Sequence, residues 1–142
     1  MRMARLLLIG IVLACLATRA SAFDAITRLT NVPLTEQDIA SLLTRGLSKQ
    51  FDTVFPDQEY GIRVIVFSRD IGNQQEAVYL SLGLARRLPD GRYLSPHASD
   101  STILTQASGL PLAQKRANLV TALTALTSEF DKAMLARRAT VK

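Results

Sequence analysis

The chain has 142 residues, and its 17 Lys and Arg against 12 Asp and Glu give a formal net charge of +5. Its only cysteine, Cys15, lies in a leader that we expect to be removed, so the remaining chain can form no disulfide, thiolate metal site or cysteine nucleophile. The single histidine excludes a metal site that needs two histidines, and we expect no metal or cofactor.

Residues 1–22 have the three parts of a cleavable secretory signal peptide. The basic start MRMAR precedes the apolar run LLLIGIVLACLA, and Ala20 and Ala22 occupy the small-residue positions of a cleavage site. We expect cleavage after Ala22 and export to a bacterial periplasm or the extracellular space, with an intact mass that matches residues 23–142. The apolar run is shorter than the roughly 20 residues that span a bilayer, which disfavours a permanent membrane anchor. After cleavage we expect no stable transmembrane segment. A lipoprotein acylated on Cys15 is the alternative that the sequence leaves open.

Charge is distributed unevenly along the predicted mature chain. Cleavage removes three arginines and no acid, which leaves 14 basic against 12 acidic side chains, a net charge near +2. The overall charge therefore gives no reason to expect a nucleic-acid partner. Residues 23–84 carry five basic and eight acidic side chains, whereas residues 85–142 carry nine and four. The C-terminal half is the part suited to an acidic protein or an anionic envelope surface.

The first predicted regular element follows residues 23–34, an arm for which the sequence predicts no particular structure. Apolar residues recur at helical spacing between Thr35 and Pro56, and Thr35 with Asp38 has the pattern of a reciprocal capping box. These signals predict one helix over residues 35–55.

Two strands joined by a turn are predicted next. Residues 60–67 carry β-branched and apolar side chains on both faces, which is typical of an interior strand. Gly72 and Asn73 indicate a turn, and residues 78–88 then alternate leucine and valine with small or polar residues, as in a strand covered on one face. Pro89–Gly91 has tight-turn composition and predicts a short hairpin.

The remaining part is predicted to hold a polar loop and a long helix. Residues 95–110 are rich in Ser, Pro, Gly and Asp, with a short strand expected only at Thr102–Leu104. Pro111 opens an apolar stripe at helical spacing that continues almost to the C-terminus. Leu123 and Phe130 lie near the middle of this stripe, so we expect both in the core.

The order of these elements predicts one small α+β domain over residues 23–142. Helix, strands and helix in succession favour a two-layer sandwich, in which an antiparallel β-meander carries the N-terminal and the long C-terminal helix on its leucine-rich face. No internal repeat or linker divides the chain.

Positive charge and an aromatic ring coincide beside the predicted tight turn, in Arg86, Arg87, Arg92 and Tyr93. Arginine and tyrosine are enriched at binding hot spots, so these four are candidate binding residues. A solvated hairpin tip that protects a sheet edge is the other interpretation.

Residue patterns indicate no catalytic site. The segment around His97 places Asp100 and several serines close in sequence, but members of known triads come from separated segments. We therefore expect a non-catalytic exported accessory or binding protein. Two alternatives remain: a small hydrolase using the His97 loop, and an envelope-associated module that binds anionic surfaces through its basic C-terminal half.

Overall fold

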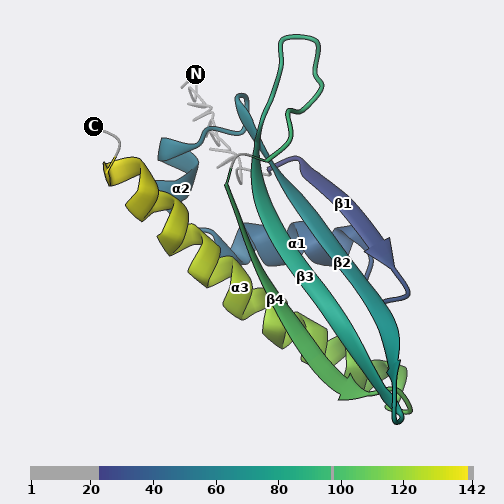
Figure 1. Ribbon diagram of the computed structural model, residues 1–142. Helices are drawn as coiled ribbons and strands as arrows, with labels where there is room; N and C mark the ends of the chain where they lie inside the picture. Colours follow the sequence, from purple (N-terminus) through teal and green to yellow (C-terminus); the bar gives the residue numbers. More distant parts are fainter. Residues whose placement is uncertain (1–22, 97, 141–142) are drawn as a thin grey trace, which may run out of the picture.

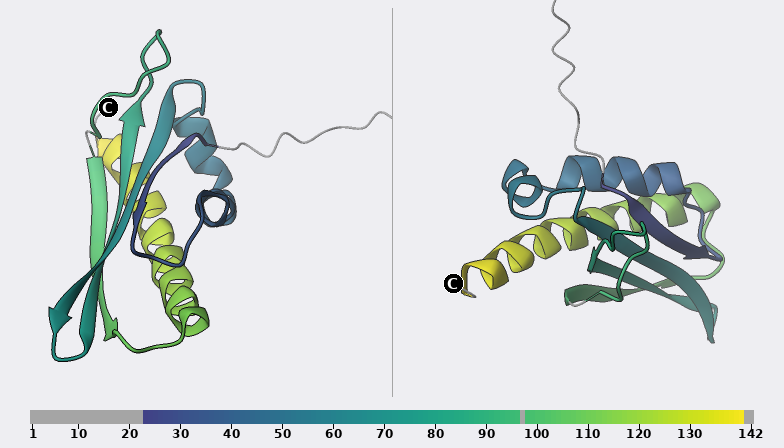
Figure 2. Two further views of the ribbon diagram at one scale, coloured as in Figure 1. Left: turned by 90° about the vertical axis from the view of Figure 1, so that its right-hand side faces the viewer. Right: turned by 90° about the horizontal axis from the view of Figure 1, so that it is seen from above.

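The computed structural model describes residues 23–96 and 98–140 (Figure 1). Its strands form one sheet in the order β1-β2-β3-β4, in which β1 pairs parallel with β2 and the other neighbours pair antiparallel. The helices lie on one face of this sheet (Figure 2), so the predicted α+β class, with a meander and helices on one face, is confirmed. In chain order the elements are β1 (Ala25–Thr30), α1 (Glu36–Gly46), α2 (Lys49–Val54), β2 (Tyr60–Gly72), β3 (Gln75–Arg86), β4 (Ala98–Ala107) and α3 (Leu112–Thr140).

Strand β1 lies within residues 23–34, the arm for which the sequence predicts no particular structure. It pairs in parallel with β2 over its whole length. Parallel neighbours need a crossover connection, and α1 with α2 supplies it. The inward residues of β1 include Ala25 and Leu29, which are only partly buried because β1 is an edge strand. The alternation of apolar and polar residues along β1 is correspondingly weak.

The predicted helix over residues 35–55 is in fact broken into α1 and α2. A Cβ atom on Gly46 would lie 2.6 Å from Thr127 Cγ2, so α1 ends where only glycine allows its close approach to α3. Ser48 then caps α2, and its backbone N–H (3.0 Å) and hydroxyl (2.9 Å) both donate to Asp131 Oδ1 of α3. The break therefore depends on contacts with a helix 83 residues farther along the chain.

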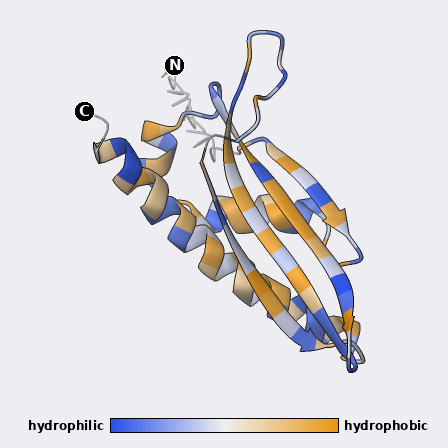
Figure 3. Ribbon diagram, viewed as in Figure 1, coloured by the Kyte–Doolittle hydropathy of each residue, from blue (hydrophilic) through white to orange (hydrophobic). Residues whose placement is uncertain are grey.

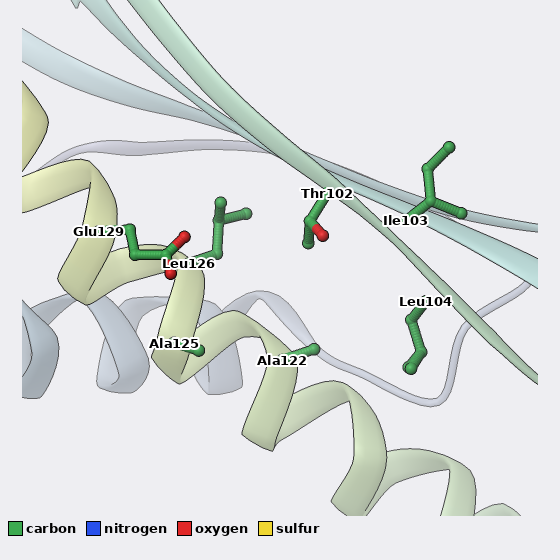
Figure 4. A pocket seen from close by; sticks show the side chains of 7 residues that line it. All are labelled: Thr102, Ile103, Leu104, Ala122, Ala125, Leu126 and Glu129. Atoms are coloured by element: carbon green, nitrogen blue, oxygen red, sulfur yellow. The ribbon is translucent and has the colours of Figure 1, made fainter.

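Strand β4 covers Ala98–Ala107, where the sequence predicts a loop with a short strand at Thr102–Leu104. In the space between β4 and α3, Thr102 and Leu104 point toward the helix and Ile103 points away from it (Figure 4). The other outward positions of β4 carry serine, threonine and alanine, so composition alone resembles a loop. Pairing with β3 along the whole strand decides the outcome.

The core lies between the sheet and the helices and contains both residues predicted for it. Leu123 is 2% exposed and Phe130 is fully buried. Three phenylalanines pack around Phe51, whose ring centroid lies 5.5 Å from that of Phe23, 4.9 Å from that of Phe55 and 5.9 Å from that of Phe130. This cluster joins the first described residue to α2 and α3.

Among residues 23–96 and 98–140, no helix combines the length and apolar composition that crossing a membrane requires. The predicted leader and His97 lie outside the described residues.

Candidate functional site

The side of the sheet away from the helices, here called the outer face, is the first candidate site (Figure 2). Strand alternation and register define which side chains it carries. Phe67 and Ile103 on this face are 41% and 66% exposed. Its larger side chains are Ile26, Arg28, Arg63, Ile65, Phe67, Arg69, Tyr79 and Ile103.

A row of side chains crosses the outer face from β1 to β4. Thr30, Phe67, Tyr79 and Ile103 occupy paired register positions on the four strands, and the rings of Phe67 and Tyr79 lie 5.3 Å apart. Both rings border an open cavity of about 430 Å³ that Arg28 also lines. Contiguous exposed apolar surface of this kind is typical of a binding surface.

The outer face is positively charged. The outward positions of the four strands include three arginines, Arg28, Arg63 and Arg69, and no Asp or Glu. None of the three forms an ion pair with another described residue. Figure 3, coloured by hydropathy, shows hydrophilic bands within the otherwise mostly apolar ribbons of β1 and β2. The face therefore combines aromatic, aliphatic and cationic groups.

Two of the predicted binding residues lie at one end of this same face. Arg87 and Tyr93 face each other in an isolated bridge, with the guanidinium carbon 5.7 Å from the ring centroid. Tyr93 Oη donates to Asp24 Oδ2 (2.9 Å), and Arg87 Nη2 lies 3.8 Å from the same oxygen. Burial, with the Asp24 hydrogen bond, raises the pKa of Tyr93, so its hydroxyl remains a donor at neutral pH.

Two glycines make room for the hairpin on the outer face. A Cβ atom on Gly61 would lie 2.5 Å from Tyr93 Cε1, and one on Gly83 would lie 2.7 Å from Pro96 Cβ. Tyr93 and Pro96 thus seat the loop between β3 and β4 on the sheet. The loop extends beyond the end of the sheet (Figure 1).

The other two predicted residues are placed differently. Arg92 pairs with Asp90 inside the turn, with 2.7 Å between Nη2 and Oδ2. Arg86 lies across from Tyr60 in the β2–β3 ladder. It is two residues from buried Leu84, so it faces the same, helical side of the sheet. The structure therefore brings Arg87 and Tyr93 together and separates Arg86 and Arg92 from them.

Part of the charge difference between the two halves of the chain is matched by ion pairs between them. Three of the four ion pairs among the described residues join a base of residues 85–142 to an acid of residues 23–84. These pairs are Arg87–Asp24, Lys115–Glu76 and Arg116–Asp38. The excess of basic over acidic residues in residues 85–142 therefore does not imply a uniformly basic surface on this half of the chain.

The polar segment that motivated a hydrolase is part of β4 from Ala98 onward. Ser99 and Ser101 are outward positions, whereas Asp100 lies on the helical side. The strand therefore separates this carboxylate from these hydroxyls.

The residues of the outer face are not singled out by a sequence motif. Arg63 interrupts an otherwise apolar strand, and Tyr79 alternates with leucines, so each carries a weak local signal. Ile103 carries none, because its exposure depends on which side of β4 the helices cover.

Comparisons with protein-family models, with curated proteins and with solved structures found no match to this chain.

Proposed function

We propose that the protein is an exported, non-catalytic binding protein that docks an acidic protein surface on its outer face. The observation that supports it is the row of exposed Phe67, half-buried Tyr79 and exposed Ile103 among arginines that have no ion pair with a described residue. Arg87 and Tyr93 extend this surface at one end.

The composition of the face favours a protein over other partners. Aromatic residues and arginine are enriched in the centre of protein interfaces, and an exposed aliphatic side chain such as Ile103 gains most from an apolar partner group. A second copy of the chain is disfavoured, because a symmetric contact would place arginines against arginines. An acidic surface with apolar groups at its centre satisfies both features.

The first test uses charge reversal on matched faces. The Arg28→Glu/Arg69→Glu variant should bind a glutamate–tyrosine copolymer at least about tenfold more weakly than the wild type at low salt, because attraction becomes repulsion. The control, Arg45→Glu/Lys49→Glu, makes the same change in charge at exposed positions on the helical side and should bind normally. Fluorescence anisotropy measures both, and equal losses would show that only net charge matters.

A second variant separates apolar from ionic recognition. Phe67→Ser/Ile103→Ser should weaken binding of the glutamate–tyrosine copolymer while leaving weak binding of polyglutamate unchanged, since both residues are exposed and carry no charge. If the wild type prefers heparin or oligo(dT) to the copolymer, the outer face is a polyanion site and the proposal of a protein partner is wrong.

Cross-linking in the native envelope then identifies the partner. A photoreactive residue at position 103 should capture a protein, and the same residue at position 40, exposed on α1, should not. The same product from both positions would rule out specific docking on the outer face.

A further inference from the structure

A second candidate site lies on the helical side of the sheet, beside the C-terminal end of α3. It is an open cavity of about 310 Å³, at the end of the sheet where β2 and β4 begin and β3 ends. This volume falls at the lower end of the range of about 300–1,000 Å³ that is usual for small-ligand pockets. Its apolar wall consists of Phe55, Tyr60, Leu84, Ala98 and Met134.

The wall is formed by the edge of the hydrophobic core. Phe55, Leu84 and Met134 are each no more than 5% exposed, so the cavity exposes only the rim of well-packed side chains. Tyr60 and Ala98 are half-buried and line it from the first residues of β2 and β4. An aliphatic chain would therefore meet apolar atoms from both the sheet and α3.

The positively charged part of the cavity comes from α3. Arg137 and Arg138 follow Met134 by three and four residues, which places them on the same side of the helix as this core residue. Both line the cavity, and neither forms an ion pair with a described residue. The end of α3 is strongly hydrophilic where its core-facing stripe stops (Figure 3). Arg86 adds a third cation one ladder position beyond the cavity residue Leu84, on the same side of the sheet.

We propose that this cavity binds an amphiphile that has one carboxylate and an aliphatic chain, such as a medium-chain fatty acid. Planar guanidinium groups match a carboxylate in geometry and charge, and the apolar wall matches the chain. Charge complementarity selects an anionic head group over a neutral or cationic one. This site lies on the opposite side of the sheet from the outer face, because α3 and the inward-facing Leu84 line it, and it is independent of the function proposed above.

Decanoate is the probe for a first test, with decanol and acetate as its matched halves. Isothermal titration of the exported protein should detect binding of decanoate, at least about tenfold weaker binding of decanol, and no binding of acetate. A charge-assisted hydrogen bond to the carboxylate contributes most of the difference in affinity between decanoate and decanol. Equal affinity for decanol would show an apolar cavity without anion recognition and would overturn the proposal.

Variants locate the site. Arg137→Gln/Arg138→Gln should weaken the binding of decanoate at least about tenfold and leave the binding of decanol unchanged. Lys132 is an exposed cation earlier on α3, and Lys132→Gln should change the binding of neither ligand. Ala98→Leu places extra atoms in the cavity and should weaken both ligands while the protein remains folded.

Two outcomes would assign the features differently. If the double glutamine variant only lowers the melting temperature and binds decanoate normally, the arginines serve the C-terminal end of the helix and the proposal fails. If sedimentation reveals a dimer that this variant loses, the cavity holds a second copy of the chain and the proposal is also overturned.

Discussion

Phe130→Ala is expected to lower the free energy of unfolding by about 3–5 kcal/mol, the usual cost of removing a buried aromatic side chain. Phe130 is fully buried, and its ring centroid lies 5.9 Å from that of Phe51 at the centre of the aromatic cluster. The deletion removes apolar contacts and leaves a cavity between α3 and α2, where the backbone has little freedom to close. Urea denaturation of wild type and variant measures the difference.

Leu112→Ala is the matched control, because Leu112 lies on the same helix but is 71% exposed. Its effect should stay within about 0.5 kcal/mol, as for most surface substitutions. Equal midpoints for Phe130→Ala and the wild type would contradict the packing of α3 on the sheet.

Lys115→Met is expected to cost about 3 kcal/mol at pH 7, because it leaves a nearly buried carboxylate without its cation. Lys115 Nζ lies 3.0 Å from Glu76 Oε1, and the two side chains are only 14% and 13% exposed. Glu76 also accepts hydrogen bonds from Gln106 and Ser68, so this polar group joins β2, β3, β4 and α3. Lys132→Met, an exposed lysine of the same helix, should change stability by less than about 0.5 kcal/mol.

The effect of Lys115→Met should decrease in acid. Burial opposes ionisation of Glu76, but hydrogen bonds from Lys115, Gln106 and Ser68 outweigh it and hold the pKa of Glu76 below its usual 4.5. A lowered carboxyl pKa contributes stability that is fully present above the unfolded value and is lost as the pH falls through the folded value. The variant lacks the cation that favours ionised Glu76, so this carboxyl takes up its proton at higher pH in the variant than in the wild type. The difference between wild type and variant should therefore be largest near pH 7, decrease steadily as the pH falls, and be smaller at pH 3. A difference that grows in acid would contradict the ionised state of Glu76.

The sequence by itself determined the features that depend on neighbouring residues. Thr35 and Asp38 form the predicted capping box, with Thr35 N–H donating to Asp38 Oδ2 (2.8 Å) and Asp38 N–H to Thr35 Oγ1 (3.2 Å). The stripe through Leu123 and Phe130 identified the buried side of α3. Capping and helical periodicity operate within about four residues, so a single sequence is enough to detect them.

Only the tertiary structure decided how distant segments meet. The parallel pairing of β1, the full length of β4 and the break before Ser48 all depend on partners that lie far along the chain. The outer face and the cavity at the end of α3 are likewise assembled from several elements, and no element carries enough of either to form a motif. Strand register and helix placement decide whether a given Ile or Arg is exposed, because the same residue changes faces when its strand shifts by one position.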